Sequence, residues 1–127
     1  MDFTTQTSDQ IHNLFRALGD KGKFEAVWSE TGDRVRLTGM VKPSLVIKLE
    51  EKHLPENAEA GRAVYVKVQQ SSKKRHYVCI KAKEGWVAFE KFYVGRKRVM
   101  SPLDFKNGFI SKNVQRTEKY FAPRPDS

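Results

Sequence analysis

The sequence contains a single cysteine, Cys79, which excludes an intramolecular disulfide. Its three histidines, His12, His53 and His76, stand far apart, so the chain has neither a Cys-x-x-Cys nor a His-x-x-x-His spacing for a structural metal. The Gly-rich phosphate-binding motifs GxxxxGKS/T and GxGxxG are also missing. We therefore expect neither a bound metal nor a cofactor.

Long apolar runs are absent as well, since no stretch approaches the roughly 18 residues of a membrane span. The first ten residues, MDFTTQTSDQ, are polar and acidic, whereas a signal peptide is basic and then apolar. At 127 residues the chain fits one domain with its own core. We expect a protein without a membrane span, located in the cytoplasm.

Positive charge is concentrated in the second half of the chain. Residues 1–60 carry 8 Lys and Arg against 10 Asp and Glu, whereas residues 61–127 carry 16 against 5, so the net charges are −2 and +11. Such an excess attracts anions, which predicts an anionic partner: a nucleotide, a nucleic acid or an acidic protein surface. The alternative is that the charge serves solubility alone.

The first predicted element is a helix over residues 8–18. Thr7 and Gln10 have the spacing of a capping box, and Ile11, Leu14, Phe15 and Leu18 form one apolar stripe. His12 and Arg16 fall off this stripe, so we expect both side chains to be solvated.

After Lys23 the apolar residues alternate, which predicts β-strands. The six predicted strands are centred on residues 24–28, 35–39, 45–49, 64–68, 78–82 and 86–89. Ser101 and Pro102 then predict the start of a short helix. The fold class is therefore mainly β (α+β), a small six-stranded antiparallel barrel with an N-terminal helix and a short C-terminal helix. Residues 1–112 form the predicted domain, and residues 113–127 a mobile basic tail.

No catalytic set emerges from the sequence. Cys79 lies in the middle of an apolar strand, where a cysteine is usually buried and inert, and His76 falls on the opposite face of that strand. The acids Glu50, Glu51, Glu56 and Glu59 lie in a polar segment without the apolar burial that tunes an acid or base. We therefore predict that the protein is not an enzyme.

Two bursts of positive charge, residues 73–75 and residues 96–98, flank the last two predicted strands. In an up-and-down meander both bursts emerge at the same end of the sheet, where Arg and Lys can bind phosphate oxygens. The candidate anion-binding or nucleic-acid-binding residues are Lys73, Lys74, Arg75, Lys91, Arg96, Lys97 and Arg98. The candidate stacking residues are Trp86, Phe92 and Tyr93.

Four stretches of the chain resemble the six-stranded barrel of the PilZ superfamily, including the N-terminal barrels of flagellar-brake proteins. They are RVRLTGMVKPSLVIKL, AGRAVYVKVQ, HYVCIKA and GWVAFEKF, which begin at residues 34, 60, 76 and 85. The resemblance implies the barrel fold and an adaptor-like role. Members that bind cyclic-di-GMP share the motifs RxxxR and D/NxSxxG, but Arg16 is followed by Asp20 and the second motif keeps only Ser44. The resemblance therefore transfers no ligand residue.

Two functions fit these observations. The first is a non-catalytic regulatory or adaptor module that resembles a PilZ-like barrel and engages an anionic partner, a nucleotide or an acidic protein surface, through its basic half. The alternative is a small β-barrel that binds nucleic acid non-specifically through phosphates. Strand alternation buries only one of Phe92 and Tyr93, and an exposed aromatic cluster favours the alternative.

Overall fold

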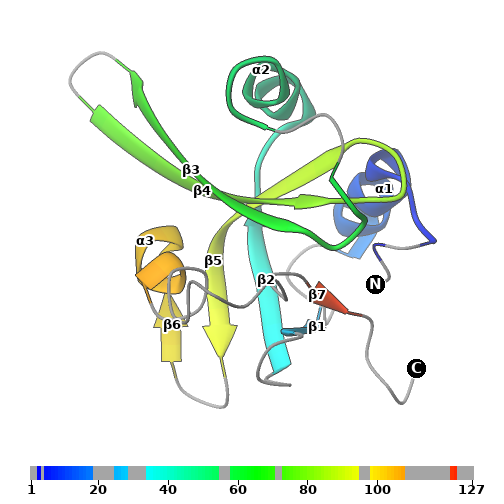
Figure 1. The fold of residues 1–127 in the computed structure, drawn as a ribbon. Helices are drawn as coiled ribbons and strands as arrows, with labels where there is room; N and C mark the ends of the chain where they lie inside the picture. Colours follow the sequence, from blue (N-terminus) through cyan, green and yellow to red (C-terminus); the bar gives the residue numbers. More distant parts are fainter. Residues whose placement is uncertain are drawn as a thin grey trace.

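The computed structural model describes residue 3 and residues 5–18, 25–28, 34–54, 58–70, 73–94, 98–107 and 121–122. Within these ranges the strands form one curved antiparallel sheet, and the helices pack against it (Figure 1). The elements are, in chain order, α1 (Ser8–Leu18), β1 (Glu25–Trp28), β2 (Arg34–Met40), α2 (Pro43–His53), β3 (Ala63–Gln70), β4 (Lys73–Lys81), β5 (Trp86–Val94), β6 (Arg98–Met100), α3 (Pro102–Phe105) and β7 (Phe121–Ala122).

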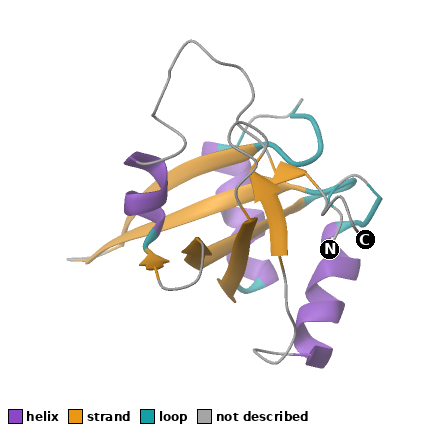
Figure 2. Cartoon of the chain, turned by 90° about the horizontal axis from the view of Figure 1, so that it is seen from below, coloured by secondary structure: helices purple, strands orange, loops and turns teal. Residues whose placement is uncertain are grey.

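The strands pair in the order β3-β4-β5-β2-β1-β7, and every described ladder is antiparallel. The long strand β5 pairs with β4 along its first half, through residues 86–89, and with β6 along its second half, through residues 92–94. The β3–β4 hairpin continues beyond β5 and reaches out past the helices (Figures 1 and 2). The predicted fold class, mainly β with an N-terminal and a short C-terminal helix, is confirmed.

A closed barrel is not shown, because the described strands form an open sheet. The two ends of the sheet do approach each other, since the Phe121 amide donates a hydrogen bond of 2.7 Å to the Gly61 carbonyl just before β3. Phe121 itself is buried at 1% exposure and belongs to the main core. This part of the predicted tail is therefore packed into the fold, and the other residues beyond Lys112 lie outside the described ranges.

Helix α1 has the predicted capping box. The Thr7 amide donates to Gln10 Oε1 at 2.9 Å, and the Gln10 amide donates to Thr7 Oγ1 at 3.2 Å. Ile11 is fully buried against the sheet. His12, in contrast, is only 7% exposed, so the prediction of a solvated imidazole is wrong. The helix buries a wider face than the apolar stripe alone indicates.

The third predicted strand, over residues 45–49, is part of helix α2. Pro43 occupies the first turn of this helix, where its missing amide hydrogen costs nothing. Val46 and Leu49 are buried three residues apart, whereas Ile47 is 57% exposed. The alternation of Leu45, Ile47 and Leu49 therefore coincides with a helical spacing of buried residues, and the helical spacing prevails.

The sheet separates two apolar clusters. The main cluster lies between the sheet, α1 and α3, and its centre is formed by the rings of Trp28, Phe105 and Phe121, whose centroids are 5.0 to 5.7 Å apart. The smaller cluster lies under α2, on the opposite face of β3, β4 and β5. Among the described residues no helix is long and apolar enough to cross a membrane.

Candidate functional site

Cys79 is not available as a nucleophile. Its side chain is fully buried in the cluster under α2, and this burial, with a smaller contribution from the negative charge of Glu50, raises the pKa of the thiol to about 12. The thiol therefore stays protonated at neutral pH. Nor do the described residues bring three or more His, Cys, Asp or Glu side chains together as a metal site would require.

A cationic surface lies on the β3–β4 hairpin, on the sheet face opposite α2. The ladder pairs Lys67 with His76, and strand alternation places Tyr65 and Lys74 on the same face as this pair. Lys106, the residue that follows α3, brings its side chain to the Tyr65 ring. We call this group the arm surface, and its members are Tyr65, Lys67, Lys74, His76 and Lys106.

Contacts between three elements hold the centre of the arm surface. The Tyr65 hydroxyl hydrogen-bonds His76 Nδ1, and the two rings are stacked with centroids 5.8 Å apart. Lys106 Nζ lies 5.0 Å from the centroid of the Tyr65 ring, a cation–π distance. Burial raises the pKa of Tyr65 above its ordinary value of 10.0, so the phenol remains neutral. Lys67 and Lys74 are exposed beside this cluster.

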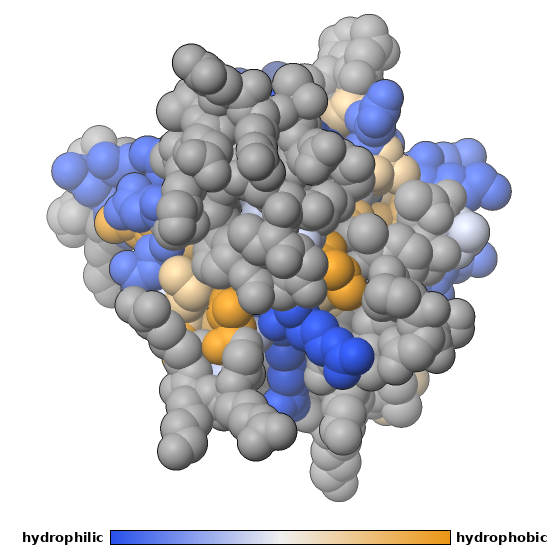
Figure 3. Space-filling view, turned by 60° about the horizontal axis from the view of Figure 1, so that its bottom comes forward, coloured by the Kyte–Doolittle hydropathy of each residue, from blue (hydrophilic) through white to orange (hydrophobic). Residues whose placement is uncertain are grey.

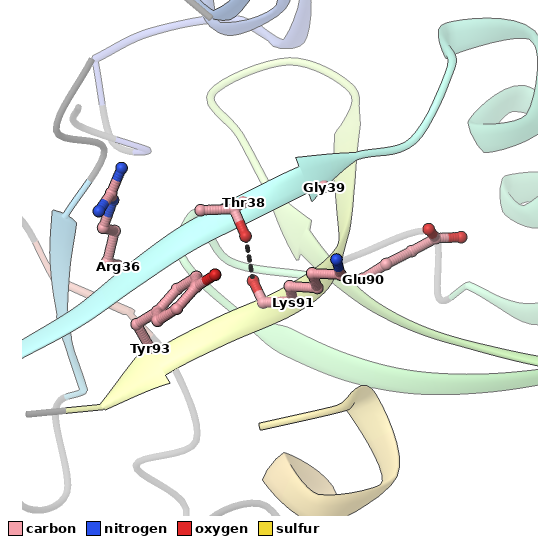
Figure 4. Close-up of a pocket in the computed structure, with 6 residues that line it drawn as sticks. All are labelled: Arg36, Thr38, Gly39, Glu90, Lys91 and Tyr93. Carbon is pink, nitrogen blue, oxygen red and sulfur yellow. Dashed lines mark hydrogen bonds between the residues drawn. The ribbon is translucent and has the colours of Figure 1, made fainter. Parts of the chain in front are cut away.

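A second polar site is a hollow of about 430 Å³ on the outer face of β2 and β5 (Figure 4). Its lining residues are Arg36, Thr38, Gly39, Glu90, Lys91 and Tyr93. Arg36 Cζ lies 5.7 Å from the centroid of the Tyr93 ring, and Thr38 Oγ1 donates to the Lys91 carbonyl at 3.3 Å. In Figure 4 Glu90 points away from Arg36 and Tyr93. One end of the hollow therefore combines an aromatic ring with a guanidinium.

The predicted anion-binding residues are divided between these places. Lys74 belongs to the arm surface, Arg75 is exposed on the opposite face of β4, and the side chain of Lys73 lies outside the described residues. Lys91 is exposed and lines the hollow. Arg96 and Lys97 also lie outside the described residues, as does the side chain of Arg98 in β6.

The described strand pairing attaches the first burst, residues 73–75, and Arg98, the last residue of the second burst, to different pairs of strands. β4 pairs with β5 only from Val78 to Lys81, and β6 pairs with the second half of β5 instead. The first burst therefore lies at the far end of the β3–β4 ladder, whereas Arg98 pairs with Val94 in the β5–β6 ladder. These two pairs of strands extend in different directions in Figure 1.

Of the three candidate stacking residues, only Tyr93 is partly exposed. Trp86 is 6% exposed and packs under α2, and Phe92 is fully buried in the main core. Neither ring offers a free face to a base, so the prediction of stacking on Trp86 or Phe92 is corrected by their burial. Alternation along β5 does place Phe92 and Tyr93 on opposite faces.

Several residues of these sites were missed from the sequence. Lys67 alternates with Val66 and Val68, which marks it as outward, but only the strand register places it beside His76. Lys106 reaches the hairpin through the packing of α3, which leaves no local signal in the sequence. Figure 3 views the molecule with its bottom turned forward, and in the described part of this face hydrophilic and hydrophobic side chains lie next to one another.

Comparison with known proteins matches residues 1–110 to the model of the formyl transferase C-terminal domain. The mitochondrial methionyl-tRNA formyltransferases of Rattus norvegicus and Mus musculus are both 26% identical over 105 residues, 83% of this chain and 25% of theirs. The enzyme of Homo sapiens is 23% identical over 114 residues, 90% of this chain and 27% of its own. The chain thus spans about a quarter of the length of these relatives. No solved structure gives a significant match.

These matches correct the functional predictions. A family model that covers residues 1–110 overturns the resemblance to PilZ barrels, and with it the regulatory adaptor and the cyclic-di-GMP association. The relatives are formyltransferases by name, so the prediction that the protein is not an enzyme is wrong. The matches give the alternative, an independent barrel that binds nucleic acid non-specifically, no more support than they give the PilZ-like adaptor. The chain belongs to the formyl transferase C-terminal domain family.

Proposed function

We propose that this chain is the tRNA-binding domain of a methionyl-tRNA formyltransferase. The observation that carries this proposal is the family match over residues 1–110, together with relatives whose names specify methionyl-tRNA as the molecule they act on. A transfer RNA is a polyanion, and residues 61–127 of this chain carry a net charge of +11. The anionic partner expected from the sequence is, in this proposal, the phosphate backbone of tRNA.

The arm surface supplies the contacts that such a backbone requires. Lys67 and Lys74 are exposed on a hairpin that extends beyond the helices, so a large RNA can reach them. Lys106 is held over the Tyr65 ring and adds a third positive charge on the same side. Lysines bind phosphates as point charges with little dependence on sequence, which suits a surface that holds the body of an RNA.

The proposal is tested by measuring the affinity of the chain for methionyl-tRNA at several salt concentrations. We expect the Lys67→Gln/Lys74→Gln variant to bind more weakly and to flatten the dependence of log K on log salt by about 1.5 to 2, because two phosphate contacts are lost. The matched control is Lys48→Gln/Lys52→Gln, which removes the same charge from exposed positions of α2.

The control variant should retain most of the wild-type affinity and slope. Equal losses in both double variants would mean that only net charge matters, which contradicts a tRNA site on the hairpin. Failure of the wild-type chain to bind methionyl-tRNA at low salt would contradict the proposed function as a whole.

The location of the protein belongs to the same proposal. The relatives are mitochondrial by name, whereas the sequence alone predicts a cytoplasmic protein. We propose that this domain belongs to a mitochondrial formyltransferase, as in these relatives, so a fluorescent fusion of the protein should co-localise with mitochondria. A uniform cytoplasmic signal would favour the prediction from the sequence.

A further inference from the structure

The hollow lies over the outer face of β2 and β5, which are paired neighbours. It forms because each strand has two consecutive residues that face outward at the same position along the pair. Phe89 and Phe92 both point into the main core, so the two residues between them, Glu90 and Lys91, both face outward. On β2, Leu37 and Met40 contact the same core, with Thr38 and Gly39 between them. A regular strand alternates, so this paired interruption opens the outer face.

Gly39 keeps the hollow open. Its φ of +67° lies in the left-handed region that glycine adopts readily. A Cβ at this position would lie 3.4 Å from the Cβ of Glu90 and 3.5 Å from the amide nitrogen of Lys91. The absence of a side chain here thus leaves the space that the neighbouring residues enclose, about 430 Å³, within the range of small-ligand sites.

The chemistry of the walls selects a ligand that is both anionic and planar. Arg36 and Lys91 supply two positive charges, and only Glu90, at the far end, is acidic. The Tyr93 ring supplies an apolar wall, and it pairs across β5 and β6 with Val99, which is 55% exposed. A bare inorganic anion would use the two cations but not the ring and the valine beside it.

We infer that this hollow binds one ribonucleotide, with its phosphate on Arg36 and Lys91 and its base against Tyr93 and Val99. A guanidinium binds phosphate oxygens through two parallel hydrogen bonds, and an aromatic side chain stacks with any base. The nucleotide is either a free 5′-monophosphate or an unpaired unit of an RNA. In the second case the inference rests on the proposed function and adds a specific contact to it, on the sheet face opposite the arm surface.

The test measures binding of adenosine 5′-monophosphate, adenosine and labelled single-stranded hexa-adenylate to the full chain. We expect adenosine to bind at least about tenfold more weakly than its monophosphate, because charged hydrogen bonds to phosphate are lost. The variants Tyr93→Leu and Lys91→Gln should each weaken the phosphate-bearing probes about fivefold or more. Lys83→Gln, an exposed lysine in the turn before β5, is the matched control and should change nothing.

The probes distinguish the two sources. Saturable binding of the monophosphate that both variants weaken supports a free nucleotide, whereas an effect confined to hexa-adenylate supports an unpaired unit of RNA. Lys91→Gln alters only an exposed side chain, so it remains informative if Tyr93→Leu folds poorly. Unchanged affinity for every probe in Lys91→Gln, or no binding by the wild-type chain, overturns the inference. Methionyl-tRNA binding that still depends on Lys67 and Lys74 would leave the proposed function standing.

Discussion

At the scale of single residues, Gly39 sets both the backbone and the shape of the outer face. Its positive φ is costly for any residue with a Cβ, by about 1 to 2 kcal/mol. We expect Gly39→Ala to lower the free energy of unfolding by about that amount in urea denaturation. Gly39→Asn should cost less, because asparagine enters the left-handed region more easily. Equal stability of Gly39→Ala and the wild type would contradict the assigned conformation.

His12 gives the fold a sensitivity to acid. Its imidazole is 7% exposed, and no described group hydrogen-bonds its Nε2. Burial lowers the pKa of His12 below its ordinary value of 6.5, an effect only partly opposed by the negative charge of Asp9. The unfolded chain therefore binds a proton more readily than the folded one. The contribution of this group to stability is fully present above pH 6.5 and is lost as the pH falls from 6.5 through the lower pKa of the folded state.

The corresponding variant is His12→Gln, which keeps a polar side chain but does not titrate. Its free energy of unfolding should fall less than that of the wild type between pH 7 and pH 5, as measured by denaturant titration at each pH. His53 and His76 are present in both proteins, so their titration cancels in the difference. Parallel pH curves for the two proteins would contradict a neutral buried imidazole.

Residue-level predictions succeeded where a local pattern decides exposure. Alternation along β5 separates Phe92 from Tyr93, and the structure places the first in the core and the second on the hollow. The same reasoning missed the burial of Trp86, since this tryptophan is covered by a helix that was expected to be a strand. Whether a strand residue is exposed depends on which element packs over that face of the sheet, and the residue itself does not indicate this.

At the scale of elements, α1 and α3 were predictable because their ends carry explicit signals. The Thr7–Gln10 and Ser101–Asp104 pairs both form reciprocal capping bonds. Helix α2 lacks a side-chain cap, and its apolar residues fit both a strand and a helix. Its true state depends on packing over the cluster that contains Val66 and Tyr77, which is a tertiary effect.

A capping box fixes the start of α3, the short helix that carries Phe105 into the core. The Ser101 side chain accepts a hydrogen bond from the Asp104 amide at 3.2 Å, and the Asp104 carboxylate accepts one from the Ser101 amide at 3.4 Å. We expect Ser101→Ala to reduce the free energy of unfolding by about 1 kcal/mol, measured by thermal or chemical denaturation. Ser44→Ala is the comparison and should cost less, because Ser44 is exposed in the first turn of α2, a helix that has no side-chain cap. A loss no larger than that of Ser44→Ala would mean that packing of Phe105 alone fixes α3.

At the scale of the whole molecule, the sequence predicted the class of fold, mainly β with an N-terminal and a short C-terminal helix, but the predicted barrel is an open sheet in the described residues. The charge asymmetry is a sum over the chain and survives local errors. The strand count does not, because one predicted strand is helix α2 and because β6 and β7, two of the seven strands in the described sheet, are too short to leave a periodic pattern. β6 pairs locally with the end of β5, Arg98 with Val94, whereas β7 pairs with a strand far away in the sequence, Ala122 with Val27. The resemblance to a barrel of another family rested on hydrophobic spacing, which many antiparallel sheets share.

The packing of β7 onto the core should depend strongly on Phe121. Its ring is 5.0 Å from that of Trp28 and 5.7 Å from that of Phe105, with almost no exposure. We expect Phe121→Ala to lower the free energy of unfolding by about 3 to 5 kcal/mol, because it leaves a large cavity among aromatic rings. Leu103→Ala, at 40% exposure on α3, is the control and should cost much less. Comparable losses in the two variants would show that β7 is not an integral part of the core.

The pairing of β1 with β7 also bears on how the protein is made. Trp28 in β1 pairs with Phe121 in β7, so β1 can form this pair only after about 90 further residues have been synthesised. At ordinary rates of synthesis that interval lasts roughly 5 to 20 seconds. During this time the indole of Trp28 has no ring of Phe121 to pack against. We expect the nascent chain to engage a chaperone on the ribosome until residue 121 has emerged and the two ends of the sheet can meet.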